Sequence, residues 1–298
     1  MWTLYNAARR TEASIERPES KRIQMGSRRT GSPPPAAPPA GTQSIQRASQ
    51  LLREVAAGNR AGLRLVDLAE RSGLEKPTVH RILQSLIAER LLMQSPRTRR
   101  YHLGQAVFEF GLAASQHFNL PDLCRPSLTR IAERTQDTAF LILRSGPDGV
   151  CVERIDGAFP IKVYSFNVSD RRPLGSGAGS LAILSALPAD EVERIVEDNG
   201  ARLKPYGGLT KEKLRSRVAR TRELGYAHYE GVAGLEGYTA VGVAIRSAGG
   251  DAIASLSVSA ISSRLTGPRL LQVVSLLRSE AAAVEKLLNG ADASGRGD

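Results

Sequence analysis

Polar side chains that can form hydrogen bonds recur along one side of the segment SGLEKPTVHRILQSLIAERLL, residues 72–92. An arginine can pair with two atoms on the edge of a guanine, a glutamine can do so with an adenine, and small hydroxyls can bond a base or a phosphate. The residues placed for this are Arg81, Gln84, Thr78 and Ser85, with Lys76 placed for a phosphate and His80 on the flank, where it could do either. The chemistry open to this row is hydrogen bonding to a nucleic acid, provided that one helix face holds it.

The apolar residues of the same segment predict that helix. They follow the i, i+3, i+4, i+7, i+8 spacing of a single buried stripe, at Val79, Ile82, Leu83, Leu86 and Ile87. Pro77 marks the first turn, because the backbone N–H groups there have no partner inside the helix. Any solvated helix face also carries Thr, Arg, Gln and Ser, so the neighbouring elements must decide between a plain surface and a DNA-reading one.

Those neighbours favour a winged helix-turn-helix. Two shorter helical patterns come first, in residues 44–57 and 63–72, and each stops at a glycine. Two short strands are expected afterwards, around 92–94 and 100–103, joined by a polar turn that contains Arg97, Arg99 and Arg100. In this motif the third helix enters the major groove of DNA and the wing lies against phosphates. We therefore predict that residues 44–104 bind double-stranded DNA and that the three wing arginines contact its backbone.

The charge distribution points to the same partner. The chain has 298 residues and a net charge of +11. Lys and Arg outnumber Asp and Glu by seven to three in residues 1–43 and by eleven to five in residues 44–104, but only by 23 to 22 in the remainder. A basic first third on a nearly neutral remainder is typical of a protein that meets a polyanion at one end.

Other classes of protein are disfavoured by what the sequence lacks. It contains no run of 18 apolar residues and no apolar segment behind its N-terminal charges, so we expect a cytoplasmic protein with no membrane partner. Cys124 and Cys151 are far apart and have no metal-ligand spacing, which predicts neither a disulfide nor a metal site. No catalytic motif joins the four scattered histidines. We therefore expect no cofactor and no enzymatic activity.

The chain divides into five parts by composition and pattern. Residues 1–43 mix Arg with Ser, Pro and Gly and are expected to be a disordered leader, within which translation could also begin at Met25. Residues 105–120 suit a linker helix, 121–290 a second domain, and 291–298 a disordered tail. Within the second domain, strands are expected at 138–145, 149–156, 160–166, 226–230, 239–246 and 251–260, and a last helix at 268–288. Strands paired mostly by hairpins, with helices at either end, indicate an α+β domain on an antiparallel sheet.

With these segments in order, the chain resembles the IclR family of bacterial transcription regulators over about residues 44–290. The likeness is carried by SIQRASQLL, LVDLAERSGLEKPTVHRILQSL, RRYHLG, PLGSGAGSLAILSALP and IASLSVSAISSRL. It implies a GAF-like effector domain that binds a small metabolite, and assembly into a homodimer or homotetramer on DNA. Such a protein would be a repressor or an activator.

The resemblance also implies where the effector binds. In the family it commonly lies against backbone amides of a glycine-rich turn and against two serines of the last strand, which here are Gly177 and Ala178, beside Ser176, and Ser257 and Ser259. Glycine lets an anion approach the backbone, and alternate strand residues share a side. The family usually has Lys where Ser180 stands and often Cys near Ala240, and its acidic pair is reduced here, with Glu230 as the candidate that we retain.

Plainer interpretations of the same residues stay open. GSGAG alone is more often a tight helix-entry turn, and the two serines alone would be ordinary inward-facing strand residues. A dinucleotide-binding fingerprint is excluded by the glycine spacing, and residues 171–173, Arg-Arg-Pro, are not expected to form a strand. The alternative function is a small-molecule enzyme or sensor with an accessory nucleic-acid domain.

Overall fold

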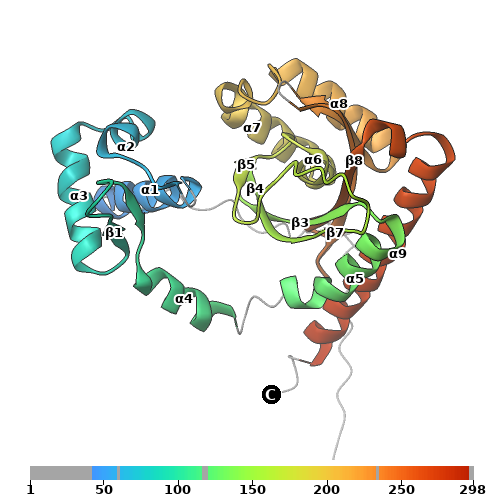
Figure 1. Cartoon of the computed structure of the whole chain (residues 1–298), viewed down its shortest axis with the longest axis horizontal. Coiled ribbons are helices and arrows are strands. Elements are labelled where there is room, and N and C mark those ends of the chain that lie inside the picture. Colours follow the sequence, from blue (N-terminus) through green and yellow to red (C-terminus); the bar gives the residue numbers. More distant parts are fainter. Residues whose placement is uncertain (1–41, 59–60, 116–119, 233–234, 295–298) are drawn as a thin grey trace, which may run out of the picture. The chain divides into compact units, whose positions relative to one another are not determined.

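The computed structural model describes residues 42–294 apart from 59–60, 116–119 and 233–234. The predicted leader therefore lies outside the described residues, except for its last two positions. Two groups of elements are present, one around a two-stranded sheet and one around a six-stranded sheet (Figure 1). We call the first the winged-helix domain and the second the sheet domain, and we describe each by itself.

The winged-helix domain contains the predicted elements in the predicted order. They are α1 (Gln43–Ala57), α2 (Leu65–Ser72), α3 (Lys76–Ala88), β1 (Leu92–Gln94) and β2 (Tyr101–Leu103). Gly73 takes a left-handed φ of 67° after α2, so the chain turns sharply into α3, whose first turn holds Pro77. Leu51, Leu68 and Leu83 of the three helices pack in one core against Tyr101 of the wing. This core fixes the outward face of α3.

Helix α4 (Gln105–Ser115) follows the wing, within residues 105–120 that we expected to form a linker helix, and the chain is next described from Leu120. Its large apolar side chains are exposed within the single chain: Phe108 is 67% exposed, Phe110 63% and Leu112 56%. Phe108 and Leu112 are four residues apart and share one face of the helix, and exposed apolar side chains of this size mark an interaction surface more often than a solvated one.

The sheet domain is built on an antiparallel sheet with the order β5-β4-β3-β8-β7-β6. The strands are β3 (Thr138–Ser145), β4 (Asp148–Ile155), β5 (Arg171–Pro173), β6 (Ala227–Val232), β7 (Leu235–Arg246) and β8 (Ala252–Ile261). The helices are α5 (Leu120–Thr135), α6 (Ala178–Ser185), α7 (Ala189–Asn199), α8 (Lys211–Leu224) and α9 (Gly267–Ser294), with short 3₁₀ turns η2 (Gly200–Leu203) and η3 (Ser262–Arg264). The α+β prediction is confirmed.

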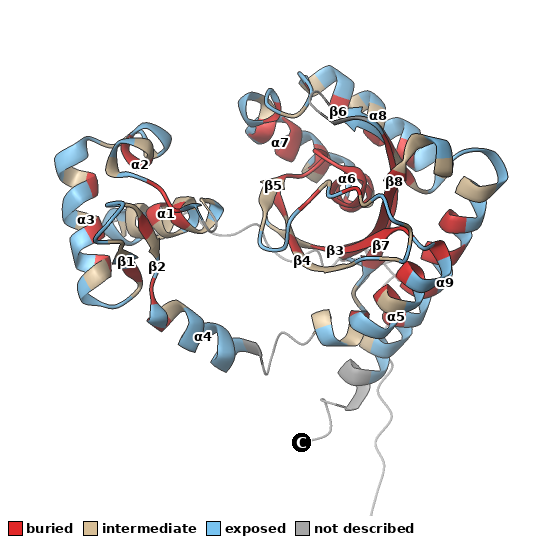
Figure 2. Ribbon diagram, in the orientation of Figure 1, coloured by how far each residue is buried: buried red, intermediate tan, exposed pale blue. Residues whose placement is uncertain are grey.

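Each face of this sheet is covered by a different set of helices. The fully buried helix α6 packs on one face, which we call the inner face, and α7 and α8 lie around it. Helices α5 and α9 pack together on the other face. Figure 2 shows the buried residues concentrated in α6 and the central strands. Because both faces are covered, β8 is buried along nearly its whole length.

Two local predictions were wrong. Residues 160–166 form no strand; Val163 and Phe166 instead pack into the inner core, and the Lys162 ammonium donates to the Gly157 and Phe159 carbonyls. The alternating apolar pattern there reflects a loop folded onto the core. Conversely, residues 171–173 do form a short strand, β5, which pairs with β4.

The C-terminal helix and the two cysteines complete the description. Helix α9 extends to Ser294, so residues 291–294, which we predicted as part of a disordered tail, are helical. Cys124 in α5 and Cys151 in β4 are buried and unpaired, and burial raises the pKa of each thiol to about 12. Across the described residues, no helix is long and apolar enough to cross a membrane, and no cluster of three potential metal ligands occurs.

Candidate DNA-reading face and effector site

The outward face of α3 carries the predicted row of donors. Val79, Leu83 and Leu86 point into the core. The opposite side holds five exposed side chains and one half-buried one, which are Lys76, His80, Arg81, Gln84, Ser85 and, half-buried, Thr78. The Ser85 hydroxyl donates to the Arg81 carbonyl at 3.2 Å, so its proton is already used within the helix. The structure therefore gathers the six predicted residues on one helix, with the serine least ready to donate outward.

The wing arginines differ in their surroundings. Arg97 and Arg99 are exposed in the turn between β1 and β2, and Arg99 takes a φ of 56° there. Arg100 is half-buried, and its guanidinium donates to the Gly62 carbonyl at 2.9 Å. That bond joins the wing to the loop before α2. Arg100 is thus placed to hold the wing, whereas the other two are placed to meet a ligand.

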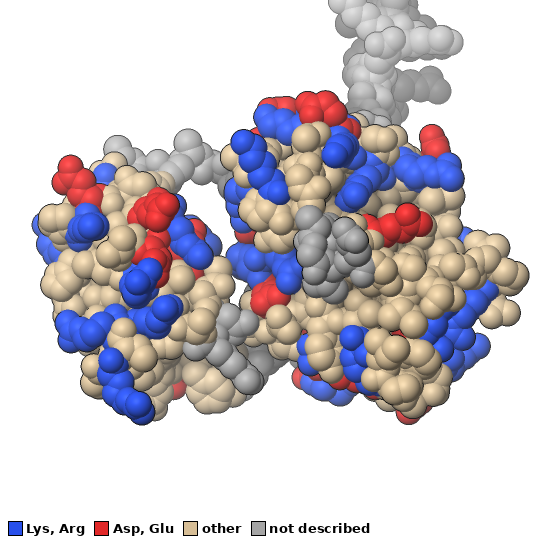
Figure 3. All heavy atoms as spheres, turned by 45° about the horizontal axis from the view of Figure 1, so that its top comes forward, with Lys and Arg blue, Asp and Glu red and all other residues tan. Residues whose placement is uncertain are grey.

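The exposed cations of this face have no acidic partners. Among the described residues, none of Lys76, Arg81, Arg97 and Arg99 takes part in an ion pair. The ion pairs of this domain lie elsewhere: Arg64–Asp67, Arg71–Glu54 and Arg90–Glu109. In Figure 3 several Lys and Arg side chains lie together on the lower part of the domain. Unpaired guanidinium groups beside exposed hydrogen-bond donors suit a polyanion with readable edges.

In the sheet domain, the glycine-rich turn leads into α6 as predicted, but one of its amides is already used. The Gly177 N–H donates to the Ser180 hydroxyl at 3.1 Å, and that hydroxyl donates back to the Gly177 carbonyl. Ser180, which is fully buried, therefore caps the turn. The expectation that the Gly177 amide faces a ligand is not met. The Ala178 amide, at the first helical position, is the better candidate.

The structure brings the turn and the last strand together. A Cβ at Gly179 would lie 3.1 Å from the Ser257 hydroxyl, and a Cβ at Gly242 would lie 2.9 Å from the Ala178 carbonyl. Both positions need glycine for α6 to sit this close to the sheet. Ser259 is two residues beyond Ser257 on the same face, and its hydroxyl lies 2.9 Å from that of Ser165.

A row of side chains crosses the inner face at Ser259, and it includes two residues that the sequence did not single out, Thr138 and Tyr229. Thr138, Ser259, Ala240 and Tyr229 are successive cross-strand partners on β3, β8, β7 and β6. Directly paired residues share a face, so their side chains lie in line. The buried Tyr229 hydroxyl has the Arg217 guanidinium as a hydrogen-bonding neighbour. The hydroxyl of Thr138 is buried and has no hydrogen-bond partner among the described residues. The same holds for the Ser176 hydroxyl in the turn. Buried polar atoms are normally satisfied, so these are suited to a ligand's oxygens.

Two guanidinium groups adjoin this row. Arg217 of α8 lies over the Tyr229 ring at 4.2 Å, and its buried Nη1 has no partner in the described part of the chain. Arg172 lies over the Phe166 ring at 4.1 Å and donates to the Ser165 carbonyl at 2.7 Å.

These cations also act on the tyrosines. Burial raises the pKa of Tyr229, and it raises the pKa of Tyr238 to about 12, while Arg172 and Arg217 oppose both shifts. Both phenols therefore stay protonated near neutral pH and can donate a hydrogen bond.

Glu230 does not join this group. It follows Tyr229 on β6, its side chain is 76% exposed, and its carboxylate lies 3.9 Å from Nε2 of His228. Adjacent residues of a strand point to opposite sides, which takes Glu230 away from the inner face. The charged and phenolic groups beside the inner-face row are therefore those of arginine and tyrosine, and the expected glutamate is not among them.

Family models match both domains. Residues 44–96 match the IclR helix-turn-helix domain, and residues 112–286 match the bacterial transcriptional regulator IclR C-terminal domain. The chain belongs to the IclR family. Its DNA-binding and effector domains are therefore those of an IclR-type transcriptional regulator, and the recognition made from the sequence is confirmed.

Relatives within the IclR family span most of the chain. XynR of Escherichia coli K12, an HTH-type transcriptional regulator, is 27% identical over 247 residues, which cover 83% of this chain and 97% of XynR. An IclR regulator from Alicyclobacillus acidocaldarius superposes with a TM-score of 0.65 at 22% identity, over 82% of this chain and 97% of its own. An IclR homologue from Microbacterium hydrocarbonoxydans, solved with 4-hydroxybenzoate, gives 0.62 at 23% identity, over 83% and 99%. The two structures support the fold.

Proposed function

We propose that this regulator binds a specific DNA operator and that a small carboxylate-bearing metabolite in the sheet domain changes its operator affinity. The observation that carries the DNA half is the face of α3, where exposed donors stand beside cations without acidic partners. In this proposal residues 44–104 bind DNA, residues 105–120 link the two domains, and residues 121–290 bind the effector. Base edges would be read by Arg81 and Gln84, and phosphates would be met by Lys76, Arg97 and Arg99.

The effector half rests on the inner-face site. The buried hydroxyls of Thr138 and Ser176 and the buried Nη1 of Arg217 have no partner among the described residues, and together they suit a ligand with oxygens and a negative charge. A carboxylate would pair with Arg217, and a second polar group would meet Ser257 and Ser259. The 4-hydroxybenzoate carried by the Microbacterium homologue has this chemistry. An aromatic or short-chain acid is therefore the proposed class of effector.

Assembly is part of the proposal. One reader helix per chain covers too few bases for a specific site, so a dimer or tetramer on a pseudo-palindrome with half-sites about 34 Å apart, or a multiple of that, is expected. The exposed Phe108 and Leu112, on one face of α4, supply apolar surface suited to a second copy. A homodimer is the smallest unit that uses both features.

Footprinting on the region upstream of the protein's own gene tests the DNA half. We expect a protected site with two-fold symmetry that competitor DNA of random sequence does not displace. Protection of an asymmetric site by monomers would contradict the proposal.

The effector half is tested with the Ser257→Ala/Ser259→Ala double variant, with Ser263→Ala, exposed just beyond the strand, as its matched control. Candidate acids are chosen from the pathways encoded beside the gene. We expect the double variant to bind the operator normally but to lose its response to the acid, because a ligand can act only through its differential affinity for the two states. A retained response would place the effector elsewhere, and turnover of the acid would revive the enzyme alternative.

A further inference from the structure

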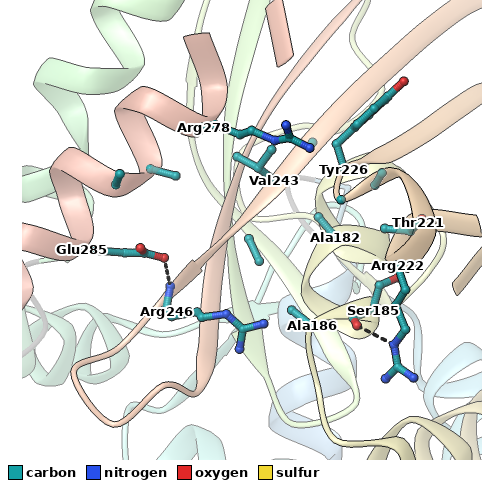
Figure 4. A pocket seen from close by; sticks show the side chains of 16 residues that line it. Ala182, Ser185, Ala186, Thr221, Arg222, Tyr226, Val243, Arg246, Arg278 and Glu285 are labelled. Carbon is teal, nitrogen blue, oxygen red and sulfur yellow. Dashed lines mark hydrogen bonds between the residues drawn. The ribbon is translucent and has the colours of Figure 1, made fainter. Parts of the chain in front are cut away.

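A second pocket lies on the sheet domain, at the other end of α6 from the glycine-rich turn (Figure 4). Its volume is about 380 Å³, which is within the usual range for small-molecule sites. The ends of α6 and α8 form one wall, α9 forms another, and the end of β7 lies between them. The turn at Ser176–Ala178 begins α6 and Ser185 ends it, and the α6 residues that line this pocket belong to the second half of the helix.

The pocket exists because β6 is shorter than β7. Strand β6 begins at Ala227, opposite Gly242, after the chain leaves α8 through Gly225 with a φ of 71°. Beyond Gly242, β7 continues to Arg246 with no described strand beside it on that edge. The walls add only small side chains at Ala182, Ala186, Ala281 and Ala282. The pocket is therefore formed by the difference in length between β6 and β7 and by the small side chains of these alanines.

Three guanidinium groups from three elements line it: Arg222 of α8, Arg246 of β7 and Arg278 of α9. None of the three makes an ion pair within the described ranges, and their side-chain hydrogen bonds go to backbone carbonyls. Arg222 donates to Ser185 at 2.9 Å and Leu187 at 2.7 Å, Arg246 to Gly250 at 2.8 Å, and Arg278 to Leu224 at 3.0 Å. Each guanidinium has five N–H donors, so each keeps donors to spare.

The pocket carries an excess of positive charge. Glu285 is the carboxylate in its lining, and it accepts from the Arg246 backbone N–H at 2.7 Å. Three arginines against one glutamate leave two positive charges. The C-terminal end of α6 contributes a partial negative charge of about half a unit, and Arg222 already binds the carbonyls there. An anion is therefore favoured over a cation or a neutral ligand.

A buried hydroxyl supplies the second indication of a ligand. Ser185 is 7% exposed, lines the pocket, and its Oγ has no hydrogen-bond partner among the described residues. Figure 4 shows Arg222 and Ser185 on one side of the pocket and Arg246 and Arg278 reaching in from the other. A ligand between these walls would meet cations at both of its ends.

We propose that this pocket is a second ligand site, for a small molecule with two anionic groups, carboxylate or phosphate. One group pairs with Arg222 and bonds the Ser185 hydroxyl; the other pairs with Arg246 and Arg278. Guanidinium groups bind both kinds of oxyanion through paired hydrogen bonds, so the chemistry admits either source. The site is separate from the one at Ser257 and Ser259 and does not depend on it.

Calorimetry on the full chain tests the proposal with succinate and pyrophosphate as two-group probes, and acetate and inorganic phosphate as their single-group counterparts. Succinate or pyrophosphate should bind one per chain and at least about tenfold more tightly than its counterpart, because two groups are paired instead of one. The stronger probe identifies the acid group. Absence of binding by both probes up to about 10 mM would overturn the proposal.

Two matched variants locate the binding. Ala282 and Ala283 are adjacent and exposed on α9, but only Ala282 lines the pocket. Ala282→Glu places a carboxylate in the pocket and should weaken the bound probe by about tenfold or more, whereas Ala283→Glu should change it by less than about twofold. Equal losses in the two variants would overturn the proposal. So would loss of the probe in the Ser257→Ala/Ser259→Ala variant, which would place it in the effector site and leave the proposed function standing.

Discussion

Arginine side chains have different partners in the two domains. In the sheet domain several of them bind carboxylates, as Arg130 does with Glu280, Arg144 with Glu191, and both Arg264 and Arg269 with the buried Asp137. On the face of α3 and in the wing turn, Arg81, Arg97 and Arg99 have no acidic partner among the described residues. These sheet-domain arginines thus join elements to one another, whereas the arginines of the α3 face and the wing turn are left in solvent.

This difference has a physical meaning. Cations near one another repel and gain nothing for the isolated fold, so their presence on one face is explained by an external polyanion. An arginine that is already paired with a carboxylate, in contrast, contributes little charge or hydrogen bonding to a nucleic acid. Removing a paired arginine or its carboxylate partner should therefore affect stability, and removing an exposed cation of the α3 face or the wing turn should affect DNA affinity.

The largest effect is expected at Asp137. Its side chain is 1% exposed and accepts from Arg264 at 2.7 Å and Arg269 at 3.0 Å. Asp137→Asn should lower the free energy of unfolding by about 3 kcal/mol, because two guanidinium groups lose their shared partner in a mostly buried site. Denaturant unfolding measures this, with the exposed Asp198→Asn as control at less than about 0.5 kcal/mol. Equal, small losses would show that the arginines are satisfied by water.

Arg81 should show the opposite behaviour. Arg81→Ala should leave the unfolding free energy nearly unchanged, cost about 1–3 kcal/mol on the cognate operator and relax base preference. Fluorescence anisotropy on operator and random duplexes measures both. A loss of the same size on random DNA would mean that Arg81 meets a phosphate and that α3 is rotated from the proposed position.

The two neighbouring wing arginines provide a finer comparison. Arg99→Ala should weaken all sequences alike and reduce the slope of log K against log salt by about one. Arg100→Ala should instead cost about 1 kcal/mol of stability, since it removes the bond to the Gly62 carbonyl that holds the wing. Melting curves beside salt titrations separate the two. Identical effects of the two variants would contradict the assignment of Arg99 to DNA contact and of Arg100 to holding the wing.

The smallest effect is expected in how the free energy of unfolding changes at acidic pH. The Arg130 guanidinium lowers the pKa of Glu280 below its ordinary 4.5. A carboxyl group with a lowered folded-state pKa stabilises the protein above its unfolded pKa, and that contribution disappears as the pH falls through the folded pKa. Glu280→Gln should thus lower stability at pH 7 by less than about 1 kcal/mol, and its difference from the parent should shrink as the pH falls below the ordinary pKa of 4.5. A constant difference between pH 7 and pH 3 would contradict this.

Local patterns in the sequence were enough to predict the main elements. Proline and glycine fixed the start of α3 and the end of α2, and alternation around the turn at Gly146 and Asp148 predicted the β3–β4 hairpin. Interactions between distant residues were not predictable. Residues 160–166 alternate like a strand, but the inner core that absorbs Val163 and Phe166 is made by segments far along the chain.

The candidate sites divide in the same way. The donors of α3 follow from helical spacing, so they could be named from the sequence. Arg217 and Tyr229 could not, because only packing of α8 against β6 brings them within 4.2 Å. The use of the Gly177 amide by Ser180 was also missed, although a serine three residues into the helix is a local signal that could have found it.

The two buried cysteines have a practical consequence. With a thiol pKa of about 12, Cys124 and Cys151 carry almost no thiolate at neutral pH, and thiolate is the form that reacts with oxidants and maleimides. A cysteine introduced at the exposed Thr98 in the wing turn would therefore be the one reactive thiol of the chain. A dye attached there would report wing contact with DNA in the otherwise unaltered protein, without first replacing either native cysteine.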